Sequence, residues 1–160
     1  MKGRAQGDGS APHEKGKASS DLEAAVAREL AAFPEIAVGY LFGSRARGEP
    51  GPESDLDVGL VLKRRGETAE QHYWWICDLA SRLESTCPGA RVDVVLLESQ
   101  GPIFAHRVLL SGRKVFEADR ARRIDFESET VVRALDFLPT YEIVERGHIQ
   151  RLARRIGRAE

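Results

Sequence analysis

Two short apolar segments with a polar stretch between them constrain this chain more than any other feature. The first, IAVGYLFG at residues 36–43, is rich in strand formers and ends at Gly43-Ser44, a pair typical of a strand-to-helix turn. The second, LDVGLVLK at residues 56–63, begins directly after the polar stretch. The pattern predicts two strands separated by a turn and by a loop over residues 49–54, EPGPES.

Helical and strand patterns alternate along the rest of the chain. A capping box, SDLE, predicts that a helix begins with Ser20 as its N-cap and ends before Pro34. Further elements are a helix at about 68–86, a strand at 90–98, a helix from Pro102 to near Gly112, a strand at 113–117, and helical segments that are interrupted at Pro139. This order predicts an α+β fold: a small mixed sheet with helices mainly on one face, and a helical C-terminal extension.

Length and composition limit the classes of protein that the chain can belong to. Its 160 residues favour one domain, with a disordered leader at 1–19, a main domain at 20–118 and a helical extension at 119–160 packed on it. The net charge of −1 argues against broad electrostatic capture of nucleic acid or membrane. No apolar stretch suits a membrane span or a signal peptide, and two cysteines make no disulfide framework. We therefore expect a cytoplasmic protein.

Three aspartates fall at positions where carboxylates need a partner or a task. Asp55 and Asp57 are two residues apart, so they point to the same face if the strand begins that early. Asp93 lies inside the otherwise apolar segment RVDVVLL. Neighbouring carboxylates repel one another, and a hard cation such as Mg²⁺ removes that repulsion while also binding phosphates. The three aspartates therefore predict a metal site for phosphoryl-type displacement, with room for two ions.

The Gly43-Ser44 turn has the features of a phosphate-binding element. A glycine lets the backbone approach a phosphate closely, and the first residues of a helix offer free N–H groups. The hydroxyl of Ser44 adds a donor, and Arg45 and Arg47 carry charges that can neutralise a triphosphate. The stretch thus combines a phosphate-binding part with a metal-binding part.

These residues resemble a known family. Gly43-Ser44, ten further residues and then Asp55-Leu56-Asp57 have the form GSx10DxD, and with Asp93 as a later aspartate the chain resembles the minimal nucleotidyltransferases of the polymerase-beta superfamily. The fuller stretch GSRARGEPGPESDLDVGLV and the tail GRKVFEADRARRIDFESETVVRALDFLP are similar to MntA-type antitoxins, which are paired with HEPN ribonuclease toxins. The resemblance extends over about Leu22 to Leu152.

The resemblance implies a fold, a reaction and a partner. The fold would be that of a polymerase-beta-type nucleotidyltransferase, with Gly43 and Ser44 binding the phosphates of ATP. Asp55, Asp57 and Asp93 would bind Mg²⁺, and Asp93 would also help activate the attacking hydroxyl. The antitoxins move AMP to a tyrosine of the partner toxin, and pyrophosphate leaves. We therefore expect an enzyme that uses ATP and Mg²⁺, binds a HEPN toxin in an oligomer, and contacts neither membrane nor nucleic acid directly.

Several alternatives remain open at this point. Asp55 could be a turn residue, Asp93 half of a structural ion pair, and the two arginines ordinary surface charge. The same chemistry could act on a small molecule, as in the aminoglycoside-modifying relatives, or the chain could be a non-catalytic antitoxin that masks its toxin. The basic side of the last helix is either a solvated face or a surface that docks the toxin. It carries Arg146, Arg151, Arg154, Arg155 and Arg158.

Overall fold

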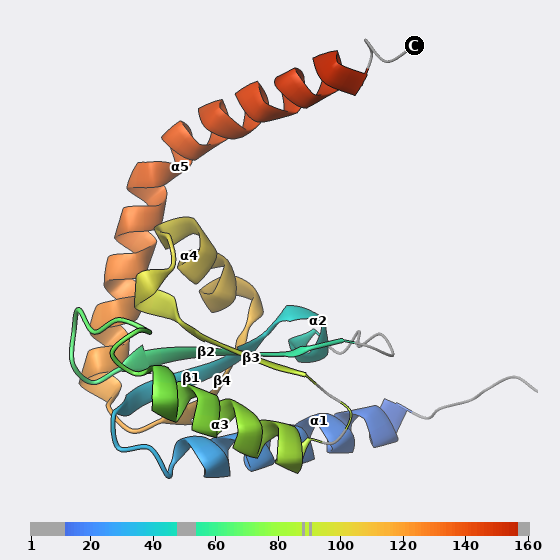
Figure 1. Cartoon of the computed structure of the whole chain (residues 1–160), viewed down its shortest axis with the longest axis vertical. Coiled ribbons are helices and arrows are strands. Elements are labelled where there is room, and N and C mark those ends of the chain that lie inside the picture. The colour runs from blue at the N-terminus through green and yellow to red at the C-terminus, as the bar shows by residue number, and fades with distance from the viewer. Residues whose placement is uncertain (1–11, 48–53, 88, 90, 157–160) are drawn as a thin grey trace, which may run out of the picture.

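A four-stranded sheet forms the centre of the molecule. The computed structural model describes residues 12–47, 54–87, 89 and 91–156. The strands are β1 (Ile36–Phe42), β2 (Leu56–Leu62), β3 (Val92–Leu96) and β4 (Arg113–Glu117), in the order β3-β2-β1-β4. The helices are α1 (Pro12–Leu30), α2 (Gly43–Ala46), α3 (Tyr73–Thr86), α4 (Pro102–Ser111) and α5 (Arg120–Ile156), with a 3-10 turn, η1, at Leu97–Ser99. Figure 1 shows their arrangement.

The sheet is mixed, as the sequence predicts. β1 runs antiparallel to both β2 and β4, whereas β2 and β3 are parallel and are connected through α3. A parallel pair needs a crossover connection, and the helix over 73–86 supplies it. The α+β class and the small mixed sheet are therefore confirmed.

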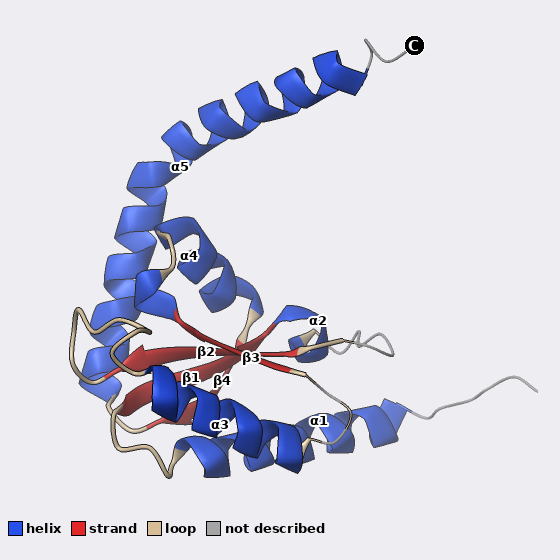
Figure 2. Cartoon of the chain, in the orientation of Figure 1, coloured by secondary structure: helices blue, strands red, loops and turns tan. Residues whose placement is uncertain are grey.

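The helices cover both faces of the sheet rather than mainly one, which corrects the prediction. Figure 2 shows α1 and α3 on one side of the sheet and α4 on the other, where the first part of α5 also packs. The reason is that the central strands are apolar on both faces, and each face needs a cover. The α1 and α3 face buries Val26, Leu30, Leu41, Leu56, Val58, Leu60, Leu79 and Leu83. The opposite face buries Val38, Tyr40, Val61, Leu97, Ala105, Val108 and Phe126.

Two helices begin or continue where local sequence signals predict otherwise. α1 begins at Pro12, so Ser20 lies inside the helix and the predicted N-cap is wrong; residues 1–11 of the predicted leader lie outside the described residues. α5 continues through Pro139 instead of ending there. A proline inside a helix removes one hydrogen bond and commonly bends it. Figure 1 shows α5 changing direction along its length, with its last part running clear of the sheet.

The first part of α5 is fixed to the sheet by a buried arginine. Arg122 is only 6% exposed, and its Nε donates a hydrogen bond of 3.0 Å to the carbonyl of Leu62 at the end of β2. Its Nη2 lies 2.5 Å from Oε1 of Glu98, an ion pair without hydrogen-bond geometry. Arg122 therefore joins α5 to β2 through the hydrogen bond and to η1 through the ion pair. None of the helices in the described ranges is long and apolar enough to cross a membrane.

We expect Arg122→Met to lower the free energy of unfolding by about 2–3 kcal/mol, because it leaves a carbonyl and a carboxylate without their buried partner. The matched control is Arg65→Met. Arg65 is exposed and pairs with Glu129 at 2.8 Å and Asp125 at 3.3 Å, so its loss should destabilise the protein clearly less than the loss of Arg122. Urea unfolding of the two variants measures the difference. Equal losses of unfolding free energy in the two variants would mean that burial of the Arg122 contacts adds nothing to stability.

Candidate active site

The carboxylates predicted to act together come from adjacent positions in the sheet. In the parallel ladder Asp57 of β2 lies opposite Asp93 of β3, and in the antiparallel ladder it lies opposite Phe42 of β1. Residues directly opposite each other share a face of the sheet. That face also holds Val61 and Val95, which follow the two aspartates at an even spacing along their strands and pack in the core under α4 and α5. Asp55 precedes β2 by one residue.

The charges of the other two aspartates act on Asp57. Partial burial raises the pKa of Asp57 above its ordinary value, and the negative charges of Asp93 and Asp55 raise it further. The positive charge of Arg47 opposes this shift. Asp57 is half-buried, whereas Asp55 and Asp93 are exposed. The arrangement therefore concentrates negative charge at one end of the sheet, where a cation would be favourable.

Gly43 packs directly against one of these carboxylates. Its φ of +75° lies in the left-handed region that favours glycine, and a Cβ atom at this position would lie 1.9 Å from Oδ2 of Asp57. The sequence predicts that this glycine allows a phosphate to approach. The structure adds a second requirement, because any side chain at this position would displace the carboxylate.

The polar residues after Gly43 surround the same corner of the sheet. Ser44 is half-buried in α2, which is only four residues long. Nε of Arg45 donates a hydrogen bond of 2.7 Å to the carbonyl of Ser54, so this side chain ties the turn to the residue before Asp55. Arg47 is exposed and close enough to influence Asp57. The structure thus brings Gly43, Arg47 and the aspartates together, and gives Arg45 a structural contact that the sequence does not indicate.

The carboxylates suit a cation that is completed by other ligands. Within the described ranges, no three His, Cys, Asp or Glu side chains stand close enough to enclose a metal ion. Mg²⁺ commonly binds through one or two carboxylates and takes its remaining oxygens from water and substrate phosphates. The adjacent Asp57 and Asp93, with Asp55 beside them, fit that mode. The assignment of Asp55, Asp57 and Asp93 as metal ligands, and of Gly43, Ser44, Arg45 and Arg47 as nucleotide ligands, stays a prediction.

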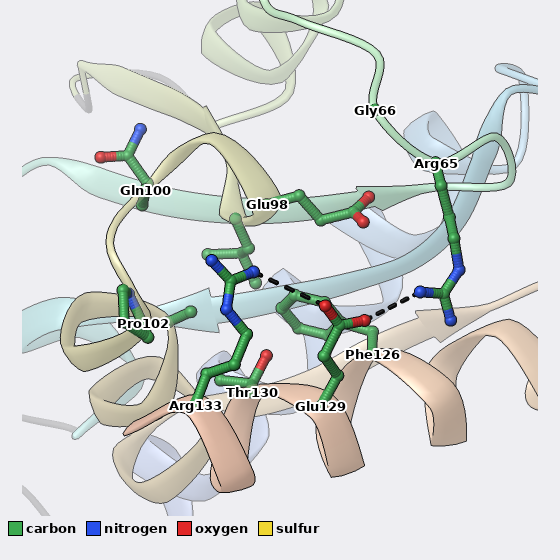
Figure 3. A pocket seen from close by; sticks show the side chains of 11 residues that line it. Arg65, Gly66, Glu98, Gln100, Pro102, Phe126, Glu129, Thr130 and Arg133 are labelled. Atoms are coloured by element: carbon green, nitrogen blue, oxygen red, sulfur yellow. Dashed lines mark hydrogen bonds and ion pairs between the residues drawn. The ribbon is translucent and has the colours of Figure 1, made fainter. Parts of the chain in front are cut away.

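A separate cavity lies near the other end of β2. It has a volume of about 270 Å³ and is bordered by η1, α4 and α5 and by the residues after β2 (Figure 3). Three of its charged groups are paired with one another, because Glu129 lies 2.8 Å from Arg65 and 3.6 Å from Arg133. Asp57 is near the start of β2 and Arg65 follows its end, so this cavity is not part of the carboxylate site.

Comparison with known protein families finds one family that matches the sheet-forming part of the chain. Residues 24–121, more than half of the 160-residue chain, match the family described as polymerase beta, nucleotidyltransferase. The chain belongs to this nucleotidyltransferase family. The matched residues contain the whole sheet, the Gly43-Ser44 turn and the three aspartates. None of the curated proteins is significantly similar to the chain in sequence.

Several solved structures share the nucleotidyltransferase fold of this chain. A toxin–antitoxin structure with AMP-PNP has a TM-score of 0.65 and 21% identity, covering 79% of this chain and 98% of that one. A complex of a tri-AMPylated HEPN toxin from Shewanella oneidensis with an MNT antitoxin has a TM-score of 0.62 and 19% identity, covering 82% and 98%. An MntA–HepT toxin–antitoxin structure has a TM-score of 0.52 and 17% identity, covering 89% and 99%. At these identities the similarity establishes a shared fold.

Proposed function

We propose that this chain is an antitoxin that transfers AMP from ATP to a tyrosine of a partner HEPN toxin and thereby neutralises it. One observation carries the chemical part of the proposal: Asp57 lies between Asp93 and the Gly43 turn, in a family of nucleotidyltransferases. Carboxylates and a phosphate-binding turn at one corner of a sheet are what transfer of a nucleotide requires. The proposed partner rests on the solved structures of the same fold, which are toxin–antitoxin complexes.

Each residue of the corner has a proposed role. Gly43 and Ser44 hold the phosphates of ATP, and Arg47 balances their charge together with that of Asp57. Asp55, Asp57 and Asp93 would hold Mg²⁺, which when bound would offset the negative charge of the carboxylates and of the reacting phosphate. Asp93, which is exposed on the edge strand β3, accepts the proton of the acceptor hydroxyl. A bond forms between that oxygen and the α-phosphorus, the bond from the α-phosphorus to the bridging oxygen breaks, and pyrophosphate leaves.

A protein acceptor is supported by the exposed surface of α5. On the side of α5 that faces away from the core, apolar residues recur at helical spacing. Val132 and Leu135 are each 59% exposed. Exposed apolar side chains that gather on one side of a helix commonly mark an interaction site. We therefore place the contact with the partner toxin along α5, at Ile124, Val131, Val132 and Leu135.

A labelling experiment tests the proposed function. The purified chain is incubated with Mg²⁺, its candidate toxin and ATP that carries a label on either the α- or the γ-phosphate. We expect the α-label to appear on the toxin and the γ-label to appear in pyrophosphate. Transfer of the γ-label to the toxin would show a kinase. Release of free AMP without a labelled toxin would show hydrolysis of ATP and would contradict transfer to the toxin.

A further inference from the structure

An aromatic pair stands beside the carboxylates and has no role in the chemistry described above. The rings of Phe42 and Phe104 meet edge to face, with centroids 5.6 Å apart and planes at 90°. Phe42 immediately precedes Gly43 and lies opposite Asp57 in the β1–β2 ladder. Phe104 comes from α4, and 38% of its surface is exposed. A partly exposed aromatic side chain therefore lies next to the proposed nucleotide-binding turn.

The backbone around the pair is tightly packed, so the position of Phe104 is fixed. Gly112 directly follows α4, and a Cβ atom there would lie 2.9 Å from the carbonyl oxygen of Leu41 and 3.4 Å from Cβ of Phe42. Val108, one turn after Phe104 on the same side of α4, is buried in the core. α4 is therefore held against the end of β1. Phe104 extends from a rigid support and does not have to be ordered when a ligand binds.

The strand order separates the two substrates of the proposed reaction. Across the sheet, Asp93 lies on β3, Asp57 on β2 and Phe42 on β1. An in-line displacement has the acceptor and the leaving group on opposite sides of the phosphorus. The acceptor hydroxyl meets Asp93, so it comes from the β3 side. The leaving pyrophosphate is then on the β1 side, at the Gly43-Ser44 turn, and the pair of Phe42 and Phe104 lies directly beside that turn, within reach of the nucleoside that the same phosphate chain carries.

We propose that the exposed ring of Phe104, braced by Phe42, stacks on the purine base of the donor nucleotide and so positions the nucleoside. This inference rests on the proposed function, because it takes ATP as the donor. Base–aromatic stacking adds affinity for any flat base and none for a bare phosphate chain. Phe104 is thus a positioning residue, and its effect should depend on the presence of the base.

The test compares two ligands on the same variants. Affinity is measured for a non-hydrolysable ATP analogue and for inorganic tripolyphosphate, both with Mg²⁺. We expect Phe104→Ala to bind the analogue about tenfold more weakly and tripolyphosphate as well as the wild type does. Phe104→Tyr should restore the affinity because it keeps the ring. Phe104→Leu, which keeps a large apolar side chain without the ring, should behave like Phe104→Ala.

Leu110→Ala is the matched control, since Leu110 is on the same helix and 74% exposed, and it should bind both ligands normally. Equal affinity of Phe104→Ala and the wild type for the analogue would overturn the inference, as would equal losses for both ligands. Normal affinity for the analogue with weaker transfer to the toxin would overturn it too, and would place the ring against the acceptor. A wild-type chain that binds the analogue but transfers no AMP would instead contradict the proposed function alone.

Discussion

Asp57→Asn should lower AMP transfer at least about a hundredfold while leaving the fold intact. The substitution keeps nearly the same shape and removes one negative charge from the site between Asp93 and Gly43. Stabilisation of charge that develops during the reaction is commonly the largest contribution to catalysis, and losing one such group costs about 10²–10³ in rate. Release of pyrophosphate in the presence of the toxin measures the effect.

The same substitution should not destabilise the protein. The pKa of Asp57 is raised by burial and by the charges of Asp93 and Asp55, so the folded state holds its proton more tightly than the unfolded state does. An ionised Asp57 at neutral pH therefore opposes folding, and an uncharged amide removes that cost. We expect Asp57→Asn to unfold at the same or a higher denaturant concentration than the wild type. Asp21→Asn, an exposed change on α1, is the control and should keep full activity. A loss of activity that accompanies unfolding of Asp57→Asn would contradict a direct role in transfer.

Gly43→Ala should be nearly as damaging to transfer, for a reason of geometry. The new Cβ would fall 1.9 Å from Oδ2 of Asp57, so the carboxylate must move. A displacement of about 1 Å in a reacting geometry can cost about a hundredfold in rate. Strain at the positive φ adds a loss of stability of about 1–2 kcal/mol. Transfer rate and urea unfolding of the variant measure the two effects separately.

Gly66→Ala separates the effect of backbone strain from that of the steric clash between the new Cβ and Asp57. Gly66 has a φ of +76°, almost the same as the +75° of Gly43, but no atom lies within 4 Å of its added Cβ. It should show a similar loss of stability with normal transfer. If Gly66→Ala and Gly43→Ala lose transfer equally, backbone strain accounts for the defect and the contact with Asp57 does not.

Much of the fold could be predicted from local sequence because its strongest signals are local. The apolar runs predict β1 and β2 to within one residue, and Pro102 and Gly112 mark the bounds of α4. The failures come from tertiary structure. The SDLE box matches a helix start, yet α1 extends back to Pro12. Which face a helix covers depends on how the sheet is packed, and no local pattern records it.

The candidate site also has a part that the local sequence indicates and a part that depends on tertiary structure. Periodicity and spacing point to Asp55, Asp57 and Asp93, and the ladder places the last two side by side. The contact between Gly43 and Asp57 depends on pairing between β1 and β2. The sequence therefore does not show that a side chain at position 43 would clash with the carboxylate of Asp57. Phe104 lies far along the chain from the turn, on a helix whose pattern indicates only burial. Its place next to Phe42 follows from the docking of α4.

The mass of the toxin after co-expression tests the central claim most directly. The toxin is purified from cells that carry either the wild-type chain or Asp57→Asn, and its peptides are analysed by mass spectrometry. We predict adenylate on a tyrosine of the toxin with the wild type and an unmodified, active toxin with Asp57→Asn, although that variant still binds it. An unmodified toxin that both forms neutralise equally well would contradict the account and show that the chain acts by masking.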